Sequence, residues 1–214
     1  MYNKNLYNKM INCECSFDEL AEFSVNMSVK KDFDFNDSFN KYYNLDKILM
    51  AIEKYLNKTI NAEYLTYWAN VYNWILMASY FFNDNYSNSF KQLLRNSISW
   101  ELDALSFFDS ENIKQDTINL NKFIVEFKVL DYLYNRINNF MIYYAFCKDE
   151  FGENQIKALF IDEKNKIFHV LETDNFIPEK NVGTKIEIDE LKEKVLNLSK
   201  RKFKKMKLFF KKKS

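Results

Sequence analysis

Apolar residues recur at helical spacing through the first two-thirds of the chain. The clearest stripe runs at intervals of three and four residues through Leu45, Ile48, Leu49, Ile52, Tyr55 and Leu56. Such spacing places side chains on one face of an α-helix. Comparable stripes predict further helices over residues 65–79, 90–105 and 120–137. Only short polar breaks separate these stripes, which favours an antiparallel helical bundle.

Local signals refine two of the predicted helices. Ser16 and Glu19 have the spacing of a capping box, which predicts a short helix through Leu20 and Phe23. Asn61 is a suitable N-cap for the helix that contains residues 65–79. This helix has apolar residues on more than one side, and we therefore expect it to be central and buried; the additional apolar residues are Val71, Trp74 and Met77.

The pattern changes to strands after residue 139. Residues 141–147, 156–161 and 167–171 are rich in β-branched and aromatic side chains and are separated by polar turns, which predicts a three-stranded antiparallel meander. Residues 185–188 add a possible short strand, and Asp189 is placed to cap a last helix. The expected fold is therefore α+β and mostly α. A single domain, residues 1–214, would comprise a helical part (1–139), a meander (140–188) and a C-terminal helix with a basic tail (189–214).

Composition narrows the class of protein. Apolar residues make up 47% of the chain and aromatic residues 18%, which is enough for a sizeable core. The chain has only two glycines, so a glycine-rich loop around a phosphate group is excluded. The N-terminal residues show no apolar signal segment, and the apolar run over residues 74–82 is too short to span a bilayer. We therefore expect a cytoplasmic protein.

Candidate catalytic and metal-binding residues are sparse. His169 is the only histidine, and strand alternation places it opposite Phe168 and Val170, as expected of an ordinary strand residue. Cys13 and Cys15 are too close in sequence for the usual zinc spacing, and Cys147 stands alone. The sequence therefore predicts no enzyme, no cofactor and no metal site.

Charge is distributed unevenly along the chain. Residues 200–214 contain nine basic residues and no acidic one; the first six basic residues are Lys200, Arg201, Lys202, Lys204, Lys205 and Lys207. The net charge of the whole chain is +1, so residues 1–199 carry a net charge of −8. An acidic body attracts basic partners. The tail is either a solvated helix end or a contact for nucleic-acid phosphates or anionic lipid.

One short stretch resembles a known family. Its pattern is Ile52-x-x-Tyr55-Leu56-Asn57-x-x-Ile60-x-x-Glu63-x-Leu65-x-x-Trp68-Ala69. This pattern is similar to a helix–turn–helix in small bacterial immunity proteins that accompany polymorphic or contact-dependent growth-inhibition toxins. Lys58 stands where glycine is usual in that turn, and we expect Asn57 to adopt the left-handed conformation instead. The resemblance implies a protein that binds a toxin, and it transfers no functional residue.

These observations favour a non-enzymatic bacterial immunity protein that neutralises a cognate basic toxin by direct binding. The candidate partner-binding residues combine acidic and aromatic side chains: Asp32, Phe33, Asp34, Phe35, Asp37, Glu150 and Glu153. The segment from Asp32 to Asp37 has a second interpretation, as a strand edge whose phenylalanines belong to the core. The alternative function is a nucleic-acid or anionic-membrane accessory protein that acts through the basic tail.

Overall fold

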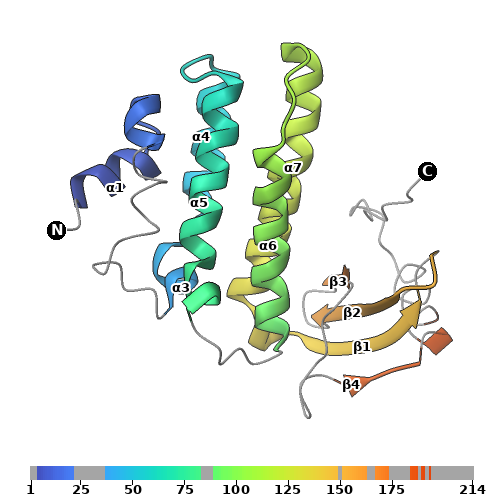
Figure 1. Ribbon diagram of the computed structural model, residues 1–214. Helices are drawn as coiled ribbons and strands as arrows, with labels where there is room; N and C mark the ends of the chain where they lie inside the picture. The colour runs from blue at the N-terminus through green and yellow to red at the C-terminus, as the bar shows by residue number, and fades with distance from the viewer. Residues whose placement is uncertain are drawn as a thin grey trace. The chain divides into compact units, whose positions relative to one another are not determined.

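The chain forms two compact units. Unit 1 comprises residues 1–87 and 91–137, and unit 2 comprises residues 88–90 and 138–214. The computed structural model describes residues 4–21, 37–82, 89–148, 151–162, 167–173, 184–187, 189–190 and 193. Helices dominate unit 1 and strands dominate unit 2, which confirms the α+β class (Figure 1). The boundary at residue 137 lies close to the predicted change from helix to strand after residue 139.

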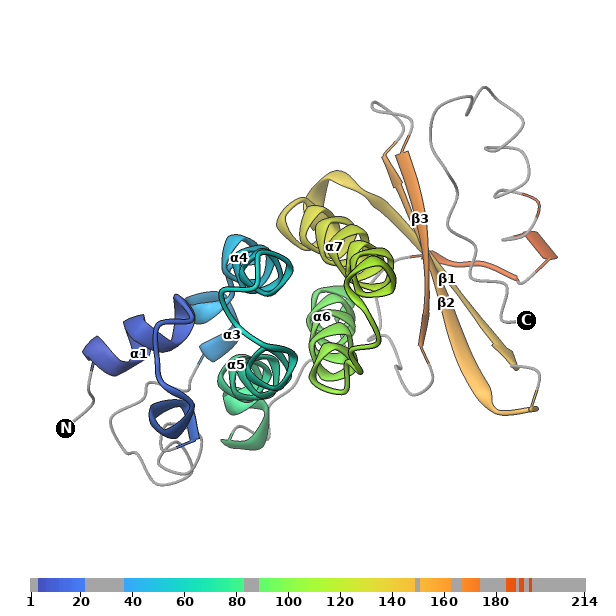
Figure 2. The same cartoon turned by 90° about the horizontal axis from the view of Figure 1, so that it is seen from above.

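Unit 1 is a helical bundle. Its helices are α1 (Lys4–Ile11), α3 (Ser38–Tyr42), α4 (Leu45–Leu56), α5 (Ala62–Phe82), α6 (Phe90–Ser106, of which Phe90 belongs to unit 2) and α7 (Ile113–Asn135). Figure 2 shows α5 and α6 side by side in one layer and α4 and α7 in a second. The predicted stripe over residues 45–56 coincides with α4. Among the described residues, no helix has both the length and the apolar character needed to cross a membrane.

Side chains from α4 and α5 hold the end of α1. The indole N–H of Trp68 donates to the Met10 carbonyl at 2.8 Å, and the Trp68 ring stacks on Tyr72 with 4.9 Å between centroids. The Lys54 ammonium donates to the Asn12 carbonyl at 2.6 Å. A cation at this position also interacts favourably with the negative end of the helix dipole. The short helix α1, which the hydrophobic pattern did not predict, is therefore stabilised by tertiary contacts.

Two of the three predicted N-caps, Ser16 and Asn61, are confirmed, whereas Asp189 is itself helical. The Ser16 hydroxyl accepts from the Glu19 backbone N–H at 3.1 Å, and the Glu19 carboxylate accepts from the Ser16 N–H at 2.9 Å. This reciprocal pair is a capping box, and residues 17–21 are helical. The Asn61 side chain accepts from the Tyr64 N–H at 2.8 Å at the start of α5.

The turn between α4 and α5 corrects one prediction. Lys58 has a φ of 59° and adopts the left-handed conformation, whereas Asn57 has a φ of −84°. The Lys58 N–H donates to the Tyr55 carbonyl and the Thr59 N–H donates to the Lys54 carbonyl, both at 2.8 Å. These two bonds define a Schellman motif, in which the residue after the C-cap is left-handed. The position of Lys58 in that motif, and not the identity of Asn57, therefore decides which residue takes the strained conformation.

We expect Lys58→Gly to raise the free energy of unfolding by about 1 kcal/mol, because glycine adopts a positive φ without a clash at Cβ. Urea denaturation monitored by far-UV circular dichroism measures this gain. The matched control is Asn57→Gly at a right-handed position, where the added backbone freedom of the unfolded chain lowers stability. Equal effects of the two substitutions would contradict the assignment of backbone strain to Lys58.

The strands that the structure describes form a mixed sheet in unit 2. They are β1 (Met141–Lys148), β2 (Asn154–Asp162), β3 (Ile167–Thr173) and β4 (Thr184–Lys185), in the order β3-β2-β1-β4. The antiparallel meander of β1, β2 and β3 is present as predicted. The sheet is nevertheless four-stranded and not purely antiparallel, because β4 pairs with β1 in parallel. That pairing joins strands distant in the sequence, which periodicity within one segment does not reveal.

Side chains cover both faces of the central strand β2. One face carries a cluster of Ala145, Leu159, Ile161 and Ile186. On the other, the Phe160 ring lies 5.9 Å from Phe90 and 6.1 Å from Phe140, centroid to centroid. Residues 189–190 and 193 are helical, at the start of the predicted C-terminal helix; the rest of that helix and the basic tail lie outside the described residues.

Candidate functional site

Two of the predicted partner-binding residues lie in the described part of the chain. Asp37 precedes α3 in unit 1, and Glu153 is exposed in unit 2, beside Gly152 in the turn between β1 and β2. Outside the described residues lie Asp32, Phe33, Asp34, Phe35 and Glu150, together with the basic residues Lys200, Arg201, Lys202, Lys204, Lys205 and Lys207. The grouping of the predicted residues into one surface therefore stays a prediction.

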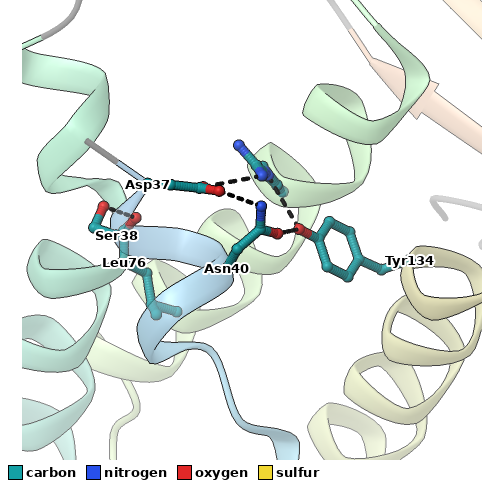
Figure 3. A network of polar contacts seen from close by, with 6 residues as sticks. Asp37, Ser38, Asn40, Leu76 and Tyr134 are labelled. Carbon is teal, nitrogen blue, oxygen red and sulfur yellow. Dashed lines mark hydrogen bonds and ion pairs between the residues drawn. The ribbon is translucent and has the colours of Figure 1, made fainter. Parts of the chain in front are cut away.

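Asp37 belongs to a closed ring of polar contacts that joins α3, α6 and α7 (Figure 3). The Arg95 guanidinium donates to the Asp37 carboxylate at 3.3 Å and to the Tyr134 hydroxyl at 3.2 Å. The Tyr134 hydroxyl donates to the Asn40 amide oxygen, and the Asn40 amide nitrogen donates to Asp37. Because burial raises the pKa of Tyr134, its hydroxyl keeps the proton that it donates to Asn40.

Aromatic rings support the Arg95 guanidinium. Its central carbon lies 5.4 Å from the centre of the Phe39 ring and 6.0 Å from that of Tyr134. Phe39 in turn stacks on Tyr43 at 4.9 Å. The Arg95 side chain is only 16% exposed, whereas that of Asp37 is 53% exposed. The Asp37 carboxylate therefore accepts hydrogen bonds from within unit 1. Its role at a partner interface stays a prediction.

A cavity of about 500 Å³ lies where the α4–α5 turn meets the α6–α7 turn. Asp116 lies in its lining with 1% of its surface exposed. Its carboxylate accepts from the Tyr55 hydroxyl at 2.6 Å, the Ser110 hydroxyl at 2.9 Å and the Glu111 N–H at 3.0 Å. The hydrogen bond from Tyr55, more than the others, lowers the pKa of Asp116. This carboxylate is satisfied by its neighbours and organises the turn before α7.

The histidine lies in unit 2, whereas two of the three cysteines lie in unit 1. His169 is partly buried on β3, and burial lowers its pKa. Cys13 and Cys15 are free and buried in unit 1, where desolvation raises the pKa of Cys13 to about 12 and that of Cys15 to about 11. Cys147 lies in unit 2 and forms no disulfide. Within the described ranges, no three histidine, cysteine or acidic side chains cluster as a metal site would require.

Among the described side chains of α5 and α6, the exposed large hydrophobic ones are both tryptophans. Trp74 is 47% exposed and Trp100 is 50% exposed. The apolar pattern on more than one side of α5 predicted a central, buried helix, and the exposure of Trp74 departs from this prediction. Val71 is buried as predicted, whereas Trp74 is half exposed.

The two tryptophans lie on the same side of the α5–α6 pair. The Ser99 hydroxyl donates to the Asn73 side chain at 2.7 Å and fixes the two helices side by side at this level. Trp74 directly follows Asn73, and Trp100 directly follows Ser99. In an antiparallel helix pair, the residues that follow two facing residues lie on the same side of the pair. We call this surface the tryptophan face, and by helical spacing it comprises Glu63, Asn70, Trp74, Asn96, Trp100 and Asp103.

No family model, characterised protein or solved structure matches this chain. The comparisons therefore supply neither a fold relative nor a functional residue. The chemistry of the described surface is what remains to indicate a function, and its most distinctive feature is the pair of half-exposed indoles.

A signal for the tryptophan face was present in the sequence. Trp74 follows Asn70 by four residues, and Trp100 precedes Asp103 by three, so each indole shares a helix face with polar side chains. The apolar character of Trp74 predicted a place in the core. The signal is clear at Trp100, whose neighbours at helical spacing are mostly polar, and weak at Trp74, where only Asn70 is polar.

Proposed function

We propose that this chain is a non-enzymatic cytosolic binding protein, specifically an immunity protein that neutralises a cognate bacterial toxin by direct contact. The observation that carries the proposal is the tryptophan face. Tryptophan is enriched among the residues that dominate binding energy at protein interfaces. Two half-exposed indoles on adjacent helices offer a large apolar contact area to a partner.

The charge balance supports the same proposal. Residues 1–199 carry a net charge of −8, which accelerates encounter with a basic protein. Toxins that cleave nucleic acids are basic because they bind phosphate backbones. An acidic inhibitor is therefore complementary to such a toxin.

The test begins with affinity capture. The tagged full chain is incubated with nuclease-treated lysate of the source organism at moderate salt, and captured proteins are identified by mass spectrometry. We expect one stoichiometric basic protein. Expression of that protein alone should arrest bacterial growth, and co-expression of this chain should restore it.

Two outcomes would contradict the proposal. One is a captured protein that does not affect growth. The other is capture only of RNA-associated or membrane proteins, abolished when Lys200, Arg201, Lys202, Lys204, Lys205 and Lys207 are all replaced by glutamine. That second result would favour a nucleic-acid or membrane accessory protein that acts through the tail, because such binding depends on cationic charge.

A further inference from the structure

We infer that the tryptophan face receives a cationic segment of the partner protein, with lysine or arginine side chains over the indoles of Trp74 and Trp100. This inference rests on the proposed function and adds the location of the binding surface and the chemistry of the segment that occupies it. Asp103, three residues from Trp100 on the same helix face, would pair with the same cations, and Glu63 lies about three turns from Trp74 along the face.

The charges on α5 and α6 support a cationic occupant. Glu63 is the only charged residue of α5. The two basic residues of α6, Lys91 and Arg95, both lie against Tyr134 of α7, at 5.1 Å and 6.0 Å from its ring centre. Asp103 is exposed and shares a helix face with Trp100. The charged side chains of the tryptophan face are therefore all negative.

Indoles and carboxylates together select cations. An ammonium or guanidinium group is attracted to the negative face of an indole ring, and tryptophan is the strongest such partner among the aromatic residues. A carboxylate nearby adds a charged hydrogen-bond acceptor. A phosphate backbone would meet Glu63 and Asp103 with unfavourable charge, so a nucleic acid does not fit this surface.

A second copy of this chain is also a poor fit. A symmetric dimer formed through the tryptophan face would place the same patch on both sides of the interface. Each copy would then bring Glu63 and Asp103 to an interface with no basic side chain on the face to pair with them, and like charges across an interface oppose association. A basic segment of a different protein has no such penalty.

Isothermal titration calorimetry of the full chain tests the inference with two synthetic probes. The first is a short amphipathic peptide of leucine and lysine, and the second has glutamate in place of every lysine. We expect only the lysine peptide to bind. Its affinity should fall at least about tenfold when Trp74 and Trp100 are both replaced by alanine, and about threefold for Glu63→Gln or Asp103→Asn.

Matched controls come from unit 2. Phe151 is 79% exposed and Glu190 is exposed, so Phe151→Ala and Glu190→Gln remove an aromatic ring and a carboxylate of the same kinds from unit 2. We expect both control variants to bind the lysine peptide as the unaltered chain does. The isosteric variants Glu63→Gln and Asp103→Asn keep the test decisive even if loss of both tryptophans perturbs folding.

Several results would overturn the inference: equal binding of the glutamate peptide, unchanged affinity in the Glu63, Asp103 and tryptophan variants, or no binding of the lysine peptide. A concentration-dependent dimer in sedimentation velocity that the tryptophan substitutions abolish would assign the face to a second copy instead. A captured toxin whose binding ignores all these substitutions would refute this surface while leaving the proposed function in place. Binding of the lysine peptide together with the absence of any toxin partner would refute the proposed function while leaving this surface in place.

Discussion

We expect Trp68→Ala to lower the free energy of unfolding by about 4 kcal/mol, the largest loss from a single substitution of a tryptophan in this chain. Trp68 is fully buried, stacks on Tyr72 and donates to the Met10 carbonyl. Its removal leaves a cavity between α1 and α5 and breaks the bond that holds the end of α1. Urea denaturation monitored by far-UV circular dichroism measures the loss without relying on the deleted fluorophore.

Two comparisons make this prediction specific. Trp68→Phe keeps a stacking ring, and the Met10 carbonyl still accepts from the Cys13 N–H at 3.0 Å, so a smaller loss of about 2 kcal/mol is expected. Trp74→Ala and Trp100→Ala should each cost less than about 1 kcal/mol, because these indoles are half exposed. A loss from Trp74→Ala as large as that from Trp68→Ala would show that the exposed indoles serve the fold and would weaken the binding proposal.

The second large effect is expected at the polar ring around Asp37. We expect Arg95→Ala to lower the free energy of unfolding by about 3 kcal/mol, because it removes hydrogen bonds to Tyr134 and Asp37 and the cation from the Phe39 ring. Arg95→Lys should recover only part of this loss, because an ammonium group does not reproduce the planar fork of donors. Equilibrium denaturation of both variants gives the comparison.

Lys91 provides the matched control for Arg95. Its ammonium also lies over the Tyr134 ring, at 5.1 Å, but Lys91 is exposed to solvent. We expect Lys91→Ala to cost about 0.5 kcal/mol or less. If the two alanine substitutions cost the same, the hydrogen bonds of Arg95 contribute nothing measurable, and the closed ring does not stabilise the bundle.

The long helices were predictable because local pattern and tertiary burial agree there. In α4, every position of the apolar stripe from Leu45 to Leu56 follows helical spacing, and Asn44 caps the helix through its side chain. The short helices α1 and α3 depend on distant partners instead. Ser38 of α3 donates to the Leu76 carbonyl of α5 at 2.8 Å, a contact that no local window contains.

The candidate site was less predictable for a related reason. The alternation of acidic and aromatic residues between Asp32 and Asp37 predicted a partner-binding surface there. Most of that segment lies outside the described residues. The tryptophan face instead combines residues of α5 and α6 that lie about 30 positions apart in the chain. Their neighbourhood follows from helix pairing, which the hydrophobic pattern indicates only in general terms. Trp74 shows how apolar character alone misassigns a surface residue.

The pairing of β4 has a consequence for the order in which unit 2 folds. The β1–β2 and β2–β3 pairs close short loops, between Lys148 and Asn154 and between Asp162 and Ile167. Thr184 of β4 must instead find Tyr143 across a much longer stretch, at a greater entropic cost, and the gain is only two paired residues. The two hairpins therefore form first, both on the ribosome and during refolding. Until β4 arrives, the outer edge of β1 stays open to a strand from another chain, which makes nascent and partly unfolded molecules the species most prone to aggregate.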